Sequence, residues 1–301
     1  MNLWRNNMGN LILSENFFVE ESKKEPLFQL FEEVFRIPVQ TLQNFEANGF
    51  WDTTYKPFSY LQEGQVIANV SMFSLPIFVN GERIYAAGIQ SVMTHPEYRR
   101  KGLMKQLFCK VLQEIDTKYE CAILFTEKPE LYEPFGFRVV QEYLMTLSYD
   151  NTLPRSSSLR KLNFYDEKDM ELIKGIIENA QQLSMEFSTL NYQSSFYFNM
   201  YDAKWNEKLY YSKKLEALIV FEVKNQVLKL FGIFAQIFPI LDDICAEISE
   251  PFTEIEFYFY PDELGLEEVA HKEFQSKKHL MVRGGEKIDF KGYKFPVLTE
   301  F

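Results

Sequence analysis

The first half of the chain alternates helix-like and strand-like spacings of apolar residues. Residues 26–36 carry leucine, phenylalanine and valine at helical spacing, and a second helical stretch runs from Pro38 to Asn48-Gly49, which suits a helix end. Two strand-like runs, residues 65–79 and 83–94, flank Asn80-Gly81, a strong hairpin signal. The pattern then predicts a helix over 101–118, a strand over 121–125, a helical turn over 129–135 and a strand over 137–148.

The second half repeats this order coarsely, without a strict sequence repeat. It predicts a strand over 159–164, a helix over 166–190, two strands within 215–234 around Lys224-Asn225, a short helix over 238–248 and a strand over 255–260. Residues 150–158, DNTLPRSSS, are polar and contain a proline and three serines, so they are the best linker candidate. We therefore expect two α+β domains, residues 1–150 and 159–301, joined by a linker over 151–158.

The length and composition agree with two folded domains. A chain of 301 residues with 46% hydrophobic residues can bury two cores. The longest nearly apolar run, residues 230–241, is shorter than the roughly 20 residues that a membrane-spanning helix needs, and no signal peptide is recognisable at the start. Three cysteines without a Cys-x-x-Cys pair argue against a disulfide framework or structural zinc and predict a cytoplasmic protein. Cys109 and Cys121 are expected in the core.

The charge is acidic overall and basic in one place. The chain has 32 basic and 43 acidic residues, a net charge of -11, which disfavours general nucleic-acid binding. The acidity is compatible with a cationic substrate, although it also serves solubility. Arg99, Arg100, Lys101, Lys105 and Lys110 form the exception, a basic cluster within twelve positions.

This cluster lies where a predicted strand leads into a predicted helix. The strand ends at Thr94, a short turn contains His95 and Pro96, and Arg99-Arg100-Lys101-Gly102 opens the helix. The first N–H groups of a helix are unpaired and carry positive potential, and Gly102 would let a ligand approach the backbone closely. These features suit a pyrophosphate cradle, while a solvated basic helix start would look the same.

The run from Gln90 to Phe108 resembles motif A of the GNAT acyl-CoA N-acyltransferases, whose pattern Gln/Arg-x-x-Gly-x-Gly/Ala follows a strand. Arg99 and Gly102 match after the strand, and Met104 departs at the last small position. The turn at residues 131–137, LYEPFGF, resembles the family's later aromatic-glycine-aromatic turn, where a tyrosine lies near the thioester sulfur. Together the two matches imply a GNAT domain over about residues 12–149. The sequence THPEYRRKGLM, the LYEPFGF turn and the degenerate second half resemble the Eis-like tandem-GNAT group. That group usually adds a sterol-carrier-like third domain, which this chain is expected to lack.

The resemblance implies an acetyl-CoA-dependent N-acetyltransferase built as α/β/α sandwiches with mixed central sheets, the second of them degenerate. Backbone groups of Val92, Met93 and Thr94 would hold the thioester carbonyl and pantetheine, and Arg99, Arg100, Lys101, Gly102, Leu103 and Met104 would hold the pyrophosphate. Tyr132 would protonate the leaving thiolate, because an unperturbed tyrosine is protonated at pH 7; a packing role is the alternative. The base would be the C-terminal carboxylate of Phe301, which could also be an ordinary chain end, or Glu127, or a water relay.

The remaining patterns narrow the function. Three histidines without a His-x-x-x-His pair make a metal site improbable, and His95 is expected to shape its turn. No nucleophile elbow, phosphate-binding loop or dinucleotide fingerprint is present in the sequence. The second half lacks a counterpart of the Arg-x-x-Gly turn, so we expect it not to bind CoA but to shape the acceptor cleft or to stabilise the first half. The expected acceptor is a primary amine of a small cationic molecule. The alternatives are a peptide or protein amine, or a non-catalytic acyl-CoA-binding or interaction module. No nucleic acid or membrane partner is expected, and a homo-oligomer is possible.

Overall fold

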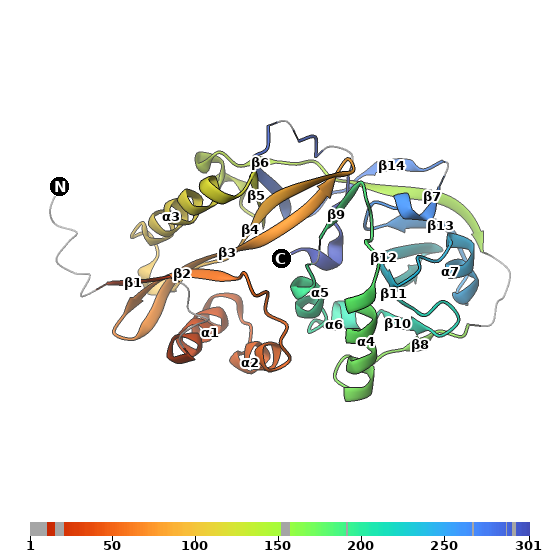
Figure 1. Cartoon of the computed structure of the whole chain (residues 1–301), viewed down its shortest axis with the longest axis horizontal. Helices are drawn as coiled ribbons and strands as arrows, with labels where there is room; N and C mark the ends of the chain where they lie inside the picture. Colours follow the sequence, from red (N-terminus) through yellow and green to blue (C-terminus); the bar gives the residue numbers. More distant parts are fainter. Residues whose placement is uncertain are drawn as a thin grey trace. The chain divides into compact units, whose positions relative to one another are not determined.

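The computed structural model describes residues 11–15, 21–151, 157–190, 192–266, 268–286, 288–290 and 293–301. The chain divides into two units (Figure 1). The first comprises residues 1–75 and 85–124, and the second comprises residues 76–84 and 125–301. The division differs from the predicted limits, because the tip of the long hairpin and everything after residue 124 belong to the second unit. Residues 152–156 of the predicted linker lie outside the described residues, so the boundary at 151–158 stays a prediction.

The elements that lie wholly or mostly in the first unit are β1 (Ile12–Glu15), α1 (Glu21–Phe35), α2 (Val39–Ala47), β2 (Lys56–Gln62), β3 (Gln65–Val79), β4 (Glu82–Thr94), α3 (Leu103–Lys118) and β5 (Cys121–Thr126). The strand order is β1-β2-β3-β4-β5. Antiparallel pairing joins β1 to β2 and β2 to β3, whereas β4 and β5 run parallel. Figure 1 draws α3 on one face of these strands and α1 and α2 on the other. The unit is therefore a helix-covered mixed sheet.

The helix α3 shows how a regular apolar spacing predicts an element well. Leu103, Leu107, Val111 and Ile115 recur every four residues and are all buried, so one face of the helix packs on the sheet. The helix begins after Gly102 rather than at residue 101. The strand β2 was not predicted, because its residues 57–61 are buried without alternation and give no period of two.

The second unit contains β6 (Arg138–Val139), β7 (Tyr143–Asn151), β8 (Arg160–Lys161), α4 (Glu167–Asn179), β9 (Phe187–Thr189), α5 (Ser194–Asn199), α6 (Ala203–Asn206), β10 (Leu209–Ser212), β11 (Ala217–Lys224), β12 (Val227–Ala235), α7 (Leu241–Glu247), β13 (Phe252–Phe257), β14 (Ala270–Glu273) and β15 (His279–Gly284). Seven of these strands form a sheet in the order β14-β7-β13-β12-β11-β10-β8. Only β12 and β13 among its registered pairs run parallel. This sheet is also mixed, as expected. Alternate residues of β11, Ala217, Ile219 and Phe221, share a buried cluster with Ile244 and Cys245 of α7.

Several predicted elements of this unit are wrong in extent. The strand predicted over 159–164 is only the two-residue β8. The helix predicted over 166–190 ends at Asn179, because the chain becomes extended at Ala180 and Gln181 N–H donates to the Ala235 carbonyl. Residues 187–189 then form β9, which pairs with residues 77–79 of β3. The strand predicted over 137–148 is split into β6 and β7, and between them Glu142 turns inward as a buried carboxylate.

Candidate functional site

The parallel strands β4 and β5 are registered over only part of their length. The paired residues run from Ala86 to Gly88 on β4 and from Cys121 to Ile123 on β5. Because β4 continues to Thr94, residues 89–94 lie beyond the registered stretch. Met93 is buried there, while Val92 and Thr94 are half-buried. The backbone groups at the end of β4 that do not pair with β5 could therefore hydrogen-bond to a ligand of extended shape.

A tight turn connects this strand to α3. His95 Nδ1 accepts a hydrogen bond of 3.4 Å from Glu97 N–H, so this side chain shapes the turn, as expected. The exposed side chain of Arg99 donates from Nε to the Thr94 carbonyl at 3.2 Å. This bond ties two residues of the predicted cofactor site to each other across the turn.

Two residues of this turn have positive φ. Arg100 lies at φ 64 and Gly102 at φ 77, and no atom lies within 4 Å of the position that a Cβ on Gly102 would take. A positive φ costs an arginine free energy but is open to glycine. The open space at Gly102 is the cradle that a side chain would partly fill, and it fits the close approach of a phosphate.

The charges around the turn fit an anion. Arg99, Arg100 and Lys101 are exposed, and Lys101 Nζ lies 4.4 Å from the centre of the Tyr98 ring. The first N–H groups of α3 have no acceptor within the helix and carry its positive dipole end. Leu103 is buried, so it can offer only its backbone, and the half-buried Met104 leaves its N–H in place. The arrangement can hold a pyrophosphate.

Tyr132 lies in the predicted aromatic turn, between two short 3₁₀ turns, residues 129–131 and 133–135. Its side chain is 8% exposed and hydrogen-bonds to the Thr126 side chain. Burial raises the pKa of Tyr132 to about 12, although the hydrogen bond to Thr126 works against this. The phenol therefore holds its proton at neutral pH, but it is a weaker acid than the unperturbed tyrosine assumed from the sequence.

Comparison with known proteins identifies the family of this region. Residues 18–140 match the family model described as the acetyltransferase (GNAT) domain. Residues 18–140 form a GNAT domain. Ninety residues of the chain are also 31% identical to the uncharacterized N-acetyltransferase YhbS of Escherichia coli K12. That match covers 30% of this chain and 53% of YhbS, so the chain spans about half the length of the curated relatives it matches.

Solved structures extend the likeness to both halves. A probable N-acyltransferase from Enterococcus faecalis V583 has a TM-score of 0.58 at 15% identity, over 92% of this chain and 73% of that one. Eis1 from Mycobacterium abscessus has a TM-score of 0.57 at 14% identity, over 91% of this chain and 73% of Eis1. Identities this low carry the fold alone. The two structures confirm the tandem GNAT-like fold and agree with the Eis-like resemblance.

The two carboxylates predicted as bases have different surroundings. Glu127 directly follows β5 and is exposed. Phe301 is half-buried, and its ring meets those of Phe125, Phe295 and Tyr192 with centroid distances of 5.4, 6.5 and 6.3 Å. The Phe301 residue thus packs at the end of β5 through Phe125, only two positions before Glu127.

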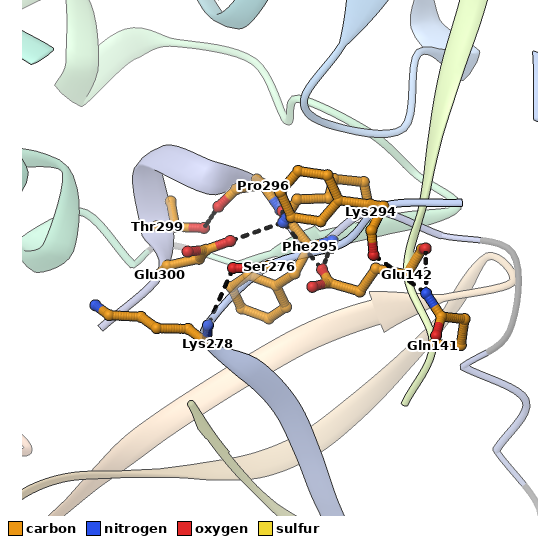
Figure 2. Close-up of polar contacts among 10 residues, drawn as sticks. Gln141, Glu142, Ser276, Lys278, Lys294, Phe295, Pro296, Thr299 and Glu300 are labelled. Carbon is orange, nitrogen blue, oxygen red and sulfur yellow. Dashed lines mark hydrogen bonds and ion pairs between the residues drawn. The ribbon is translucent and has the colours of Figure 1, made fainter. Parts of the chain in front are cut away.

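The segment that leads to Phe301 is held by an ion cluster that the sequence did not predict (Figure 2). Lys294 is fully buried, and its Nζ lies 3.0 Å from Glu142 Oε1, 2.7 Å from Glu300 Oε1 and 2.8 Å from the Phe295 carbonyl. Burial works to lower the pKa of Lys294, but the two carboxylates outweigh it and raise that pKa, so the ammonium stays charged. Burial raises the pKa of Glu142 despite the neighbouring Lys294. No local sequence signal joins residues 142 and 294.

The second half differs from the GNAT domain at the corresponding parallel pair, β12 and β13. The helix after β12, α7, has Asp242 and Asp243 in its first turn. Two carboxylates at a helix start repel a phosphate, which supports the prediction that this half does not bind CoA. It stays a prediction.

Three further observations bear on the chemistry. The described residues contain no group of three or more histidine, cysteine or acidic residues placed to hold a metal ion. Among those same residues, no helix has the length and apolar character needed to cross a bilayer. Cys121 and Cys245 are buried, but Cys109 is exposed, because its position on α3 faces away from the sheet; the expectation of a core role for it is wrong.

Proposed function

We propose that the GNAT domain binds acetyl-CoA and transfers the acetyl group to a primary amine of a small cationic molecule by direct attack. The observation that carries this is the turn before α3, where Arg100 and Gly102 adopt positive φ next to open space and exposed basic side chains. Such a turn aims helix N–H groups at a pyrophosphate. The family match over residues 18–140 supports the same reaction class.

On the donor side, the turn and the end of β4 would divide the work. Residues 99–104 would hold the pyrophosphate through backbone N–H groups and basic side chains. Val92, Met93 and Thr94 would meet the pantetheine and the thioester carbonyl with their backbone, since they lie beyond the registered part of β4 and β5. An N–H group aimed at the carbonyl oxygen stabilises the negative charge that develops there during attack.

The proton transfers need one acid and one base. Acetyl-CoA supplies the activated acyl group, and the amine must be neutral to attack it. Tyr132, which keeps its proton at neutral pH, would donate to the departing sulfur. Glu127 and the terminal carboxylate of Phe301 stay the predicted bases, with a water relay as the third possibility.

The acceptor is proposed from charge. The net charge of -11 favours a cationic amine such as a polyamine or an aminoglycoside-like molecule, and no nucleic acid or membrane partner is proposed. The second half would shape the acceptor cleft or stabilise the GNAT domain. A cytoplasmic location is proposed as well, supported by cysteines that are all free thiols.

The deciding experiment is calorimetric binding of acetyl-CoA. The test variant combines Arg100→Glu with Gly102→Asp, and the control combines Lys161→Glu with Gly265→Asp. The control makes the same charge change at an exposed lysine and at a glycine that also has positive φ, 63, and open space, but in the second unit. Wild type and control should bind with micromolar affinity, and the test variant should not.

Turnover on a panel of polyamines, aminoglycosides and peptides then separates the acceptor classes. Transfer to small polycations supports the proposal, and transfer only to peptides supports the peptide alternative. Binding without turnover on any amine indicates a non-catalytic acyl-CoA-binding module. No acetyl-CoA binding by the wild type would overturn the proposed function.

A further inference from the structure

A cluster of polar side chains, most of them buried, lies in the first unit at the end of β4. We call Tyr55, Ser59, Asn69, Ser71 and Ser91 the β4 support. Ser59, Asn69 and Ser71 have no exposed surface, and Tyr55 is 3% exposed. Polar groups are costly to bury unless they are hydrogen-bonded, so a cluster of this kind in a sheet interior calls for a reason beyond packing.

Its centre is Asn69 on β3, whose amide makes three hydrogen bonds. Nδ2 donates to the Ser91 carbonyl at 2.8 Å and to Ser71 Oγ at 2.9 Å, and Oδ1 accepts from Ser59 Oγ at 2.6 Å. Both donors and the acceptor are therefore used, which leaves the amide one orientation. The Asn69 side chain therefore holds the Ser91 carbonyl in one position.

Ser91 itself has an unusual backbone. Its φ is 55, in the left-handed region, although it lies inside the strand β4 and is not a glycine. Such a conformation persists only where the surroundings hold it. Tyr55 adds a second hold, because its hydroxyl donates to Ser91 Oγ at 3.1 Å. Burial raises the pKa of Tyr55 to about 12, partly offset by its bonds to Ser71 and Ser91, so it remains a donor throughout the neutral range.

The strained residue directly precedes the three residues assigned to the thioester. Turning the Ser91 peptide toward Asn69 takes its carbonyl out of the regular strand direction and sets the orientation of the peptides that follow. We propose that Asn69 is a positioning residue for acyl transfer: by holding the Ser91 carbonyl, it aims the backbone N–H groups of residues 92–94 at the acyl carbonyl. This inference rests on the proposed function.

The test uses one variant that removes the hydrogen bonds of Asn69 and a second substitution that lets residue 91 keep its backbone conformation without them. Asn69→Leu keeps the size of the side chain but makes no hydrogen bond. Adding Ser91→Gly lets residue 91 adopt positive φ without strain, so the double variant can keep the backbone shape without Asn69. The matched control is Asn151→Leu. Asn151 is also a buried asparagine that donates to two carbonyls, those of Ile248 and Glu250, but it lies in the second unit.

We expect kcat for acetyl transfer to fall about tenfold or more in Asn69→Leu, since a displaced oxyanion donor acts like a missing one. The KM for acetyl-CoA should change less, because the pyrophosphate turn is untouched. The double variant should recover most of the lost rate, and Asn151→Leu should keep the wild-type rate. A merely structural role for Asn69 predicts no rescue by Ser91→Gly, and that outcome would overturn the inference.

Amide chemical shifts of residues 92–94 provide a readout that does not need turnover. They should move in Asn69→Leu and return in the double variant. If the wild type transfers no acetyl group, the proposed function fails by itself, and unmoved amide shifts would then separately overturn the positioning role. If Asn69→Leu does not fold, Tyr55→Phe, which removes a single hydroxyl, should shift the same amides by a smaller amount; unmoved shifts there count against the inference equally.

Discussion

Replacing Lys294 by methionine should destabilise the second unit more than any exposed charge change in it. The ammonium is fully buried and is shared by Glu142 and Glu300, whose side chains are 5% and 18% exposed (Figure 2). The substitution leaves two carboxylates facing each other where little water can reach them. Methionine fills most of the lysine volume, so the loss measures charge and hydrogen bonding rather than a cavity.

The expected size follows from this burial. Removing one partner of a buried ion pair costs about 3–5 kcal/mol, because the remaining charge is left uncompensated. An exposed pair is worth only about 0–1 kcal/mol. Lys214 and Asp243 form such a pair at 3.2 Å, with side chains 56% and 45% exposed, so Lys214→Met is the matched control. Against a usual domain stability of about 5–15 kcal/mol, the Lys294→Met loss is a large share.

Urea unfolding followed by tryptophan fluorescence measures the difference. Trp205 is a buried reporter in the second unit, and Trp4→Phe with Trp51→Phe removes the other two tryptophans. Adding Glu142→Gln and Glu300→Gln to Lys294→Met should restore much of the loss, since a neutral cluster has no uncompensated charge. The reasoning is refuted if Lys294→Met costs no more than Lys214→Met, or if the neutral cluster is as unstable as Lys294→Met alone.

Three shorter predictions address the site and the packing. Tyr132→Phe should lower kcat about 10²-fold in a steady-state acetylation assay and leave the calorimetric affinity for acetyl-CoA unchanged, whereas a packing role predicts no change in kcat. In urea unfolding, Gly175→Ala should stabilise α4 by about 0.5–1 kcal/mol because nothing lies within 4 Å of the new Cβ, while Gly88→Ala should cost about 1–3 kcal/mol because a ring carbon lies 2.2 Å away. Burial would raise the pKa of Glu114, but hydrogen bonds to two lysines lower it below 4.5. Its contribution to stability should thus be complete above about pH 4.5 and vanish as the pH falls through the folded-state pKa, and Glu114→Gln should remove that dependence.

The shape and charge of the turn before α3 could be predicted from the sequence because all of its parts are local; its role as a cofactor site stays a prediction. A strand, a proline turn, basic residues and a glycine lie within a dozen positions, and their chemistry does not depend on the rest of the fold. The positive φ of Gly102 follows from the residue type, but that of Arg100 does not, because most arginines avoid this region. Met104 departs from the family pattern, but the proposed site would use only its backbone N–H.

The β4 support could not be recognised in the same way. Asn69 and Ser71 lie within the strand predicted over 65–79, and Ser91 lies within the strand predicted over 83–94, so none of them stood out. Polar residues at alternate, core-facing positions of the strand over 65–79 were the available signal. It points to a buried cluster, but not to a partner on the neighbouring strand. Lys294 and Glu142 gave no signal at all, because 152 positions separate them in the chain.

The second unit repeats the order of elements but differs from the first at the predicted cofactor site. Its parallel strands β12 and β13 correspond to β4 and β5, yet a 3₁₀ turn over residues 297–299 lies against both of them. Val297 N–H donates to the carbonyl of Tyr258, just after β13, at 3.1 Å, and a Cβ on Gly232 of β12 would come within 2.7 Å of Leu298 Cδ1. The chain's own segment therefore lies against the backbone where the resemblance would place a pantetheine. Binding of CoA there would require displacing a segment that the Lys294–Glu142 ion pair ties to the loop before β7. Together with the missing basic turn, this segment supports the prediction that the second half does not bind CoA.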